Sequence, residues 1–159
     1  KRFGKRLTVE KKIDQKLLPA KVPQLVLQPM IENAVVHGIE QIKQGMIKIK
    51  IYSNAENLYL QVMNSGKPLT KDVKEKIETL LNQKPEEVSE GRGHHVSLAI
   101  RNINERVKLI YGEQYGLCIE QKGEYIVSTI IIPLGEEKSH MERDSRENVR
   151  KRLEETGRF

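Results

Sequence analysis

The sequence predicts an α/β protein: a two-layer sandwich in which a mixed, mostly antiparallel sheet packs against three helices. Three observations support this fold class. Apolar residues lie at 46, 47, 49 and 51 and alternate strictly at 58, 60 and 62, and they recur at helical spacing in three longer segments. The expected order of elements is strand, helix, hairpin, helix, long loop, helix, hairpin, which separates helices and strands into two layers.

A first strand is expected over residues 7–13, where Leu7, Val9 and Ile13 are apolar. Two prolines then mark a loop, and a helix should run from about 24 to 38. Pro29 lies inside that helix, so either a short turn precedes the main helix or the helix bends at the proline. Gly38 is a plausible end.

The hairpin of 46–51 and 58–62 turns at residues 53–57. Residues 64–68, with sequence NSGKP, break the strand pattern and predict a loop. A second helix should then begin at Thr70 or Asp72, either of which can cap it, and continue to about residue 82.

Residues 83–96 read QKPEEVSEGRGHHV and predict a long loop, of the kind that often serves as a functional lid. A third helix is expected over 97–111, ended by Gly112, and two strands over 117–121 and 125–133 complete the core. This gives one domain over 1–134. Residues 135–159 hold seven acids and seven bases and predict a charged terminal helix or tail.

Composition narrows the function classes. The net charge is +6, and residues 1–16 hold seven bases against two acids. We interpret this cluster as a solvated strand edge rather than a nucleic-acid arm, because aromatic residues make up 4% and Trp is absent.

Cys118 lies in an apolar strand pattern and is expected to be a buried, inert thiol. No zinc-ligand spacing and no bilayer-crossing apolar run occur in the sequence.

The stretch LQPMIENAVVHGI places Glu32, Asn33 and His37 inside an apolar helical stripe. Asn33 and His37 are four residues apart and so share a helical face. An Asn oxygen can bind Mg²⁺, a His can donate to a phosphate oxygen, and a Glu beside the metal can orient or deprotonate a hydroxyl. By pattern alone, simple solvent exposure is the better explanation, because polar positions on a helix are usually just exposed ones.

Longer segments carry a specific resemblance. VPQLVLQPMIENAVVHGI resembles the N box of sensor histidine kinases of the YesM/LytS-like branch. RFGKRLTVEKKID resembles the first strand of that domain, and IIIPL its last. SLAIRNINERVKLIYG resembles the helix of the second glycine box, with Asn102 and Arg106 at its signature positions. The likeness covers residues 2–134 in the family's order.

The resemblance implies the Bergerat ATP-binding fold, with ATP and Mg²⁺ bound between the helices and a lid at 83–96. Glu32 and Asn33 would be the catalytic pair, with Asn33 as the Mg²⁺ ligand. MNSGKPL would be the first glycine box. The remaining nucleotide-binding residues that it implies are His37, Asn64, Gly66, Leu69, Leu98 and Arg101.

The sequence departs from the family's pattern at four points. Asn64 stands where the family has an Asp that accepts from the adenine amino group, and Pro68 and Ala99 stand where it has Gly. Tyr125-Ile126 replaces a common Gly-Thr pair, which removes a hydroxyl near the adenine. Each change weakens one expected contact with the nucleotide.

The expected function is that of a histidine-kinase catalytic domain, presenting ATP to a histidine on an upstream helical domain outside this chain. The phosphate would pass to a response-regulator receiver domain. The full protein would be a homodimer in a bacterial cell membrane with this domain in the cytoplasm, and the chain alone would be inactive. His94, His95 and His140 are not assigned as phosphate acceptors.

Three alternatives remain. A degenerate module with weak or no ATP binding, acting as a scaffold, would account for the four departures. A stand-alone ATPase of the gyrase type would need Glu32 as base and a dimerising strap, which the sequence lacks. Nucleic-acid binding has little support.

Overall fold

The structure, a computed structural model, describes residues 6–39, 43–82 and 95–135. In these ranges five strands form a sheet in the order β1-β2-β3-β5-β4, with β1 parallel to β2 and the other pairs antiparallel. The strands are β1 (Leu7–Ile13), β2 (Gly45–Ser53), β3 (Asn57–Ser65), β4 (Gly116–Lys122) and β5 (Tyr125–Pro133). The helices are α1 (Leu27–Asn33), α2 (Lys71–Asn82) and α3 (His95–Tyr111), with short turns η2 (Gln15–Leu17) and η3 (Ala34–Gly38).

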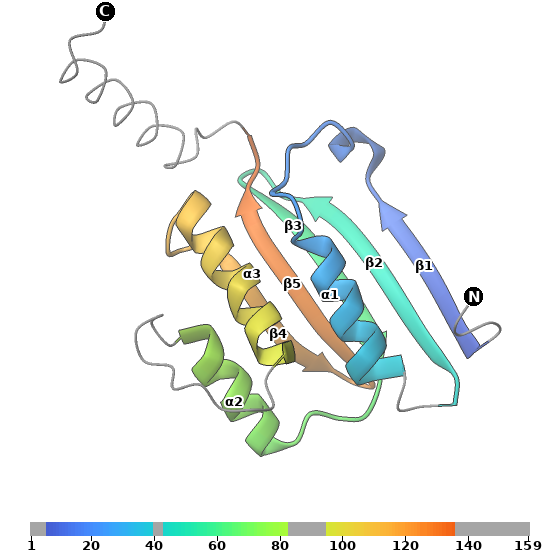
Figure 1. The fold of residues 1–159 in the computed structure, drawn as a ribbon. Coiled ribbons are helices and arrows are strands. Elements are labelled where there is room, and N and C mark those ends of the chain that lie inside the picture. The colour runs from blue at the N-terminus through green and yellow to red at the C-terminus, as the bar shows by residue number, and fades with distance from the viewer. Residues whose placement is uncertain (1–5, 40–42, 83–94, 136–159) are drawn as a thin grey trace, which may run out of the picture.

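All three helices lie on one side of the sheet (Figure 1), so the predicted two-layer α/β sandwich is confirmed. Strand alternation assigns each side chain to the helix side or to the opposite, open face. The helix side supplies the buried strand residues of the core, among them Ile47, Leu58, Leu60, Val62, Ile130 and Ile132. From the helices, Met30, Ala34, Ile103 and Val107 complete it.

The first helix is regular only as far as Asn33. Pro29 lies in the first turn of α1, where the backbone N–H needs no helical partner, so the proline does not bend the helix. After Asn33 the chain forms a wide π-helical turn, η3. Such turns are rare, and many occur at functional sites. The prediction that Asn33 and His37 share a helical face stays a prediction, because the His37 side chain lies outside the described residues.

Two predicted boundaries are wrong. β3 continues through Asn64 and Ser65, because these residues pair with Ile126 and Tyr125 of β5, although their composition predicted a loop. α3 begins at His95, so the last two residues assigned to the long loop are helical. Residues 83–94 and the predicted tail from 136 onward lie outside the described residues.

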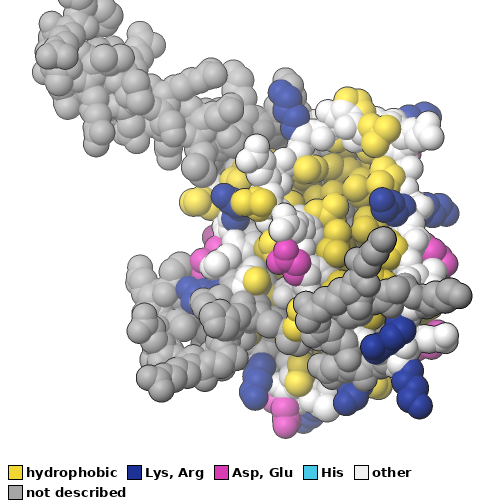
Figure 2. Space-filling model, turned by 45° about the vertical axis from the view of Figure 1, so that its right-hand side comes forward, with side chains coloured by type: hydrophobic (Ala, Val, Ile, Leu, Met, Phe, Trp, Pro, Cys, Tyr) yellow, Lys and Arg dark blue, Asp and Glu magenta, His cyan; other side chains and the backbone are white. Residues whose placement is uncertain are grey.

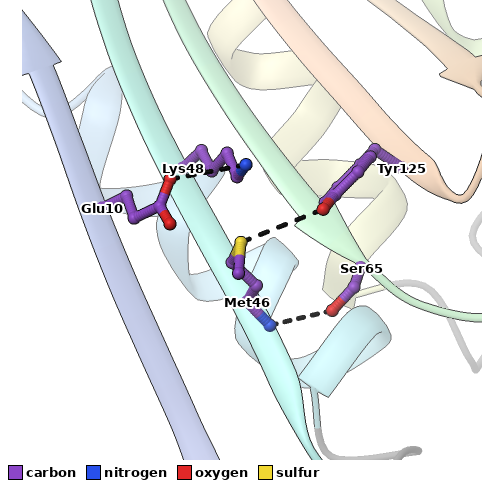
Figure 3. A network of polar contacts seen from close by, with 5 residues as sticks. All are labelled: Glu10, Met46, Lys48, Ser65 and Tyr125. Carbon is purple, nitrogen blue, oxygen red and sulfur yellow. Dashed lines mark hydrogen bonds and ion pairs between the residues drawn. The ribbon is translucent and has the colours of Figure 1, made fainter.

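The open face of the sheet carries polar and aromatic contacts (Figure 3). Lys48 forms an ion pair with Glu10 at 3.4 Å and lies over the ring of Tyr125, 5.4 Å from its centroid. Met46 N donates to Ser65 Oγ at 2.8 Å. These contacts join β1, β2, β3 and β5 on the side away from the helices.

Cys118 corrects our expectation of a buried thiol. It is exposed, because its neighbour Leu117 points to the core and strand alternation places Cys118 on the open face. Partial burial of the thiol raises the pKa of Cys118, and the nearby Glu120 carboxylate raises it further, whereas Lys122 lowers it. The thiol is thus accessible but weakly nucleophilic near neutral pH.

Asn104 joins three elements at the far side of the helical layer. Its side chain is 4% exposed; Nδ2 donates to the Leu81 carbonyl at 2.9 Å, and Oδ1 accepts from Leu117 N at 2.9 Å. A side chain at Gly116 would collide with the same Oδ1, because a Cβ there would lie 2.4 Å away. The end of α2, the middle of α3 and the start of β4 therefore depend on one amide.

We predict that Asn104→Ala lowers the free energy of unfolding by about 2–4 kcal/mol, because it leaves a carbonyl and an N–H without their partner. The matched control is Asn102→Ala. Asn102 lies two residues away on the same helix and is exposed, so its loss should cost no more than about 0.5 kcal/mol. Urea denaturation of both variants measures the difference, and equal losses would show that the Asn104 contacts contribute little.

For Cys118 we predict alkylation by iodoacetamide in the folded protein, at a rate that rises with pH up to a pKa above the ordinary thiol value. Glu120→Gln removes the nearby negative charge and should lower that pKa, so labelling at pH 8 should speed up about two- to threefold. Mass spectrometry of the labelled chain gives the rate. Protection until the protein is unfolded would contradict the exposed position.

Candidate functional site

Asn33 ends α1 on the flank of the helix that faces away from Ile31. It is half-buried, and within the described residues its side chain makes no hydrogen bond. Its amide oxygen is therefore available to a ligand. Glu32, one residue earlier, is exposed and accepts a hydrogen bond from Gln28 Nε2 at 2.8 Å. This bond uses one of the two carboxylate oxygens, so the other oxygen stays open on the exposed side of α1.

Asn64 lies near the end of β3 on the helix side of the sheet. Its side chain is 4% exposed, and Nδ2 donates to the Ser65 carbonyl at 3.3 Å. No described residue donates to Oδ1, so this buried amide has an acceptor to offer. An acceptor is what recognition of an exocyclic amino group requires.

Strand pairing places four side chains in one row across the sheet on the helix side. Ile47, Asn64, Ile126 and Gln121 are successive partners through β2, β3, β5 and β4. Ile126 therefore lies directly beside Asn64, at the position where a hydroxyl was expected to be missing. Asn64 thus lies between two isoleucines, with the amide of Gln121 at the end of the row.

Gln121 is a residue that the sequence reasoning missed. Its Oε1 accepts from Leu69 N at 2.9 Å, and its Nε2 donates to the Gly123 carbonyl at 3.0 Å. The first contact fixes the segment after Gly66 against the end of β4. Nothing local in the sequence indicates it, because the two partners are 52 residues apart.

The end of the η3 turn reaches this same part of the sheet. A Cβ at Gly45, where β2 begins, would lie 2.3 Å from Ile39 Cδ1, so Ile39 packs directly against that backbone. Gly45 precedes the residues that pair with the end of β3. The π-helical turn that follows Asn33 and the segment around Asn64 thus meet at one end of the molecule (Figure 1).

Arg101 lies in the first half of α3 and is 8% exposed. Its Nε donates to Glu105 on the next turn, and this ion pair is its only hydrogen-bonded or charged contact among the described residues. A guanidinium carries five N–H donors, so four remain for an anion. Arg106, in contrast, donates to the Gln24 carbonyl at 3.2 Å and links α3 to the segment before α1. This contact joins two segments of the fold.

The structure leaves part of the predicted site undescribed. Gly66 and Leu69 are half-buried after β3, and Ala99 is half-buried in α3. The side chains of His37 and Leu98, and residues 83–94, lie outside the described residues. Within the described part of the chain no three His, Cys, Asp or Glu side chains gather. A bound Mg²⁺ would therefore rely on Asn33, water and phosphate oxygens.

A separate groove of about 920 Å³ crosses the outer surface of α3. It lies between the start of α1 and the end of α2, and it is lined by residues that include Leu25, Pro29, Leu81, Asn102 and Leu109. Of the residues discussed for the nucleotide it contains only Ala99. The groove is thus distinct from the cluster around Asn33 and Asn64.

Comparison with known proteins gives one consistent family, although no family model matches the chain. The sensor histidine kinase YpdA of Escherichia coli is 34% identical over 70% of this chain, which corresponds to 18% of YpdA. The sensor protein LytS of Bacillus subtilis is 30% identical over 76% of the chain, or 19% of LytS. The sensor histidine kinase YesM of the same organism is 30% identical over 81% of the chain, or 20% of YesM. The chain thus spans about a fifth of the length of these curated relatives.

Solved structures agree on the fold. The catalytic domain of histidine kinase ThkA superimposes with a TM-score of 0.55 at 20% identity, covering 80% of this chain and 79% of that one. The blue-light activated histidine kinase of Erythrobacter litoralis gives a TM-score of 0.57 at 18% identity, covering 84% of this chain and 37% of the kinase. Across the described residues, none of the helices combines the length and apolar character needed to cross a membrane.

Proposed function

Since the chain belongs to the catalytic domains of LytS- and YesM-like sensor histidine kinases, we propose that it binds ATP with Mg²⁺ and presents the γ-phosphate to a histidine elsewhere in the full protein. The observation that carries this proposal is the pair of side-chain amides at one end of the molecule. Asn33 and Asn64 are at least half-buried, and each offers an oxygen that no described residue uses.

Each residue would have a separate task. Asn64 Oδ1 would accept from the adenine amino group, above the apolar floor made by Ile47 and Ile126. Asn33 would supply a side-chain oxygen to Mg²⁺, and Arg101 would offer its remaining N–H groups to a phosphate oxygen. Bound Mg²⁺ would neutralise phosphate charge during transfer. The chain's own contribution is to position the nucleotide.

Glu32 would act from the exposed side of α1. Its Oε1 accepts from Gln28, whereas the adjacent Asn33 lies on a half-buried flank. As a base toward the acceptor histidine, Glu32 would use its other oxygen, with Gln28 holding the first. The acceptor itself would belong to an upstream helical domain, so the chain alone would bind nucleotide and transfer little phosphate.

The wider assembly is also part of the proposal. One similar structure is histidine kinase ThkA in complex with the response regulator protein TrrA, with a TM-score of 0.51. By analogy, a response-regulator receiver domain would accept the phosphate from the full protein. That protein would be a homodimeric membrane sensor with this domain in the cytoplasm. The alternative is a scaffold that has lost nucleotide binding, which Ile126 and Ala99 would favour.

Calorimetric titration with a non-hydrolysable ATP analogue tests the proposal. We predict that Mg²⁺ strengthens binding by about tenfold or more, and that Asn33→Ala removes this gain because the metal loses its protein ligand. Asn57→Ala is the control, because Asn57 is also half-buried but lies at the opposite end of β3. A folded sample without detectable binding at millimolar nucleotide would establish the scaffold instead.

Asn64→Asp is predicted to have two opposite effects. Nucleotide affinity should rise about three- to tenfold, because a charged acceptor binds the adenine amino group more strongly. The free energy of unfolding without nucleotide should fall by about 1–3 kcal/mol, because a carboxylate cannot donate to the Ser65 carbonyl. Calorimetry and urea denaturation measure the two changes. Asn57→Asp adds the same charge away from the site and should leave the affinity unchanged, and loss of affinity in Asn64→Asp would argue against adenine at this position.

A further inference from the structure

A second surface, independent of the nucleotide site, lies along the edge strand β1. Parallel pairing with β2 sets Val9 beside Ile47 and Ile13 beside Ile51, so both β1 residues point to the helix side of the sheet. Ile47 is buried, yet Val9 is 48% exposed and Ile13 is 37% exposed. We call Val9, Lys11 and Ile13 the β1 strip. Figure 2 shows a continuous apolar area on this side of the molecule, with Lys and Arg side chains along its margin.

The β1 strip is exposed because the helical layer stops short of it. α1 and η3 pack on β3, α3 packs on β4 and β5, and β1 packs chiefly on β2 (Figure 1). On α1, Pro29 lines the groove beside α3, and Ile31 is a partly buried residue packed against the core. The helical layer therefore leaves the apolar residues of β1 exposed beside α1.

Lys11 adds a charge to this surface. It points to the same side as Val9 and Ile13 because it lies midway between them on the strand, opposite Ile49. It is exposed and forms no ion pair within the part of the chain that the structure describes. A partner that covers the strip must therefore place a negative charge between two apolar contacts.

The spacing selects the kind of partner. Ile13 lies four positions after Val9 on the strand, which is a distance of about 13 Å. About two turns of an α-helix span a similar length. A strand added to the free edge of β1 would pair with its backbone and leave Val9 and Ile13 exposed on the face. A helix lying on the face would cover both.

We infer that the β1 strip docks an amphipathic α-helix of a partner protein, with apolar residues two turns apart and a carboxylate on the turn between them. The apolar residues cover Val9 and Ile13, and the carboxylate pairs with Lys11. The docked helix would extend the helical layer beside α1. This surface is separate from Asn33 and Asn64, so the inference does not depend on nucleotide binding.

The experiment uses two synthetic helical peptides of about 18 residues, identical except that Glu in one is Lys in the other at the turn between the apolar residues. Binding is followed by amide chemical shifts of the whole ¹⁵N-labelled chain and by fluorescence anisotropy. The Glu peptide should bind saturably and shift amides of β1, β2 and α1. The Lys peptide should bind at least about tenfold more weakly.

Two charge-reversed variants provide the matched pair. Lys11→Glu should weaken binding of the Glu peptide about tenfold or more. Lys12→Glu should change the affinity for this peptide by no more than about twofold, because Lys12 is exposed on the opposite face of the same strand. Equal effects of the two substitutions would overturn the inference, as would equal binding of the two peptides.

Other occupants give distinct results, and each would overturn the inference. If the chain binds no peptide but co-sediments with phosphatidylglycerol vesicles, and Lys11→Glu abolishes this co-sedimentation, the occupant is a membrane surface. Self-association that Val9→Ser abolishes would identify a second copy of the chain. Nuclear Overhauser contacts from the Val9 methyl groups to residues 136–159 in the free chain would identify its own tail.

Discussion

Strand register is the constraint on which the rest of the molecule depends. Side chains alternate between the two faces of a strand, so a shift of one residue would transfer each to the other face. The observed register of β2, β3, β5 and β4 places Asn64 on the helix side between Ile47 and Ile126. A shift of β3 by one residue would expose Asn64 and bury Ser65, and the acceptor assigned to adenine would be lost.

The same alternation explains why part of the fold was predictable. Strict apolar alternation predicted the strands of the first hairpin and their buried face, because burial against helices selects every second residue. The end of β3 was missed, since Asn64 and Ser65 have the composition of a turn and are held in the strand by pairing with β5. Cys118 was predicted to be buried because its sequence neighbours are apolar, but strand alternation places it on the open face.

Contacts between distant segments could not be predicted. Gln121 accepts from Leu69, and Asn104 bonds Leu81 and Leu117; nothing local in the sequence distinguishes these amides from solvent-exposed ones. The π-helical turn after Asn33 was not predicted either, because nothing local in the sequence distinguishes it from a continuing α-helix. Resemblance to a family, in contrast, identified the segments around Asn33 and Asn64, because it draws on whole motifs rather than on local preference.

The two amides also bear on the choice between a kinase domain and a scaffold. The Asn64 side chain is 4% exposed, and no described residue donates to its Oδ1. Among the described residues no buried side-chain nitrogen or oxygen lacks a hydrogen-bond partner, so this oxygen carries no desolvation cost that would decide between the two functions. Its position decides more: Asn64 lies on the helix side of the sheet between Ile47 and Ile126, where an acceptor can meet a planar ligand on an apolar surface. Ile126 and Ala99 would remove contacts from the site but leave this acceptor in place, which favours a nucleotide site whose contacts are fewer than the family's usual set.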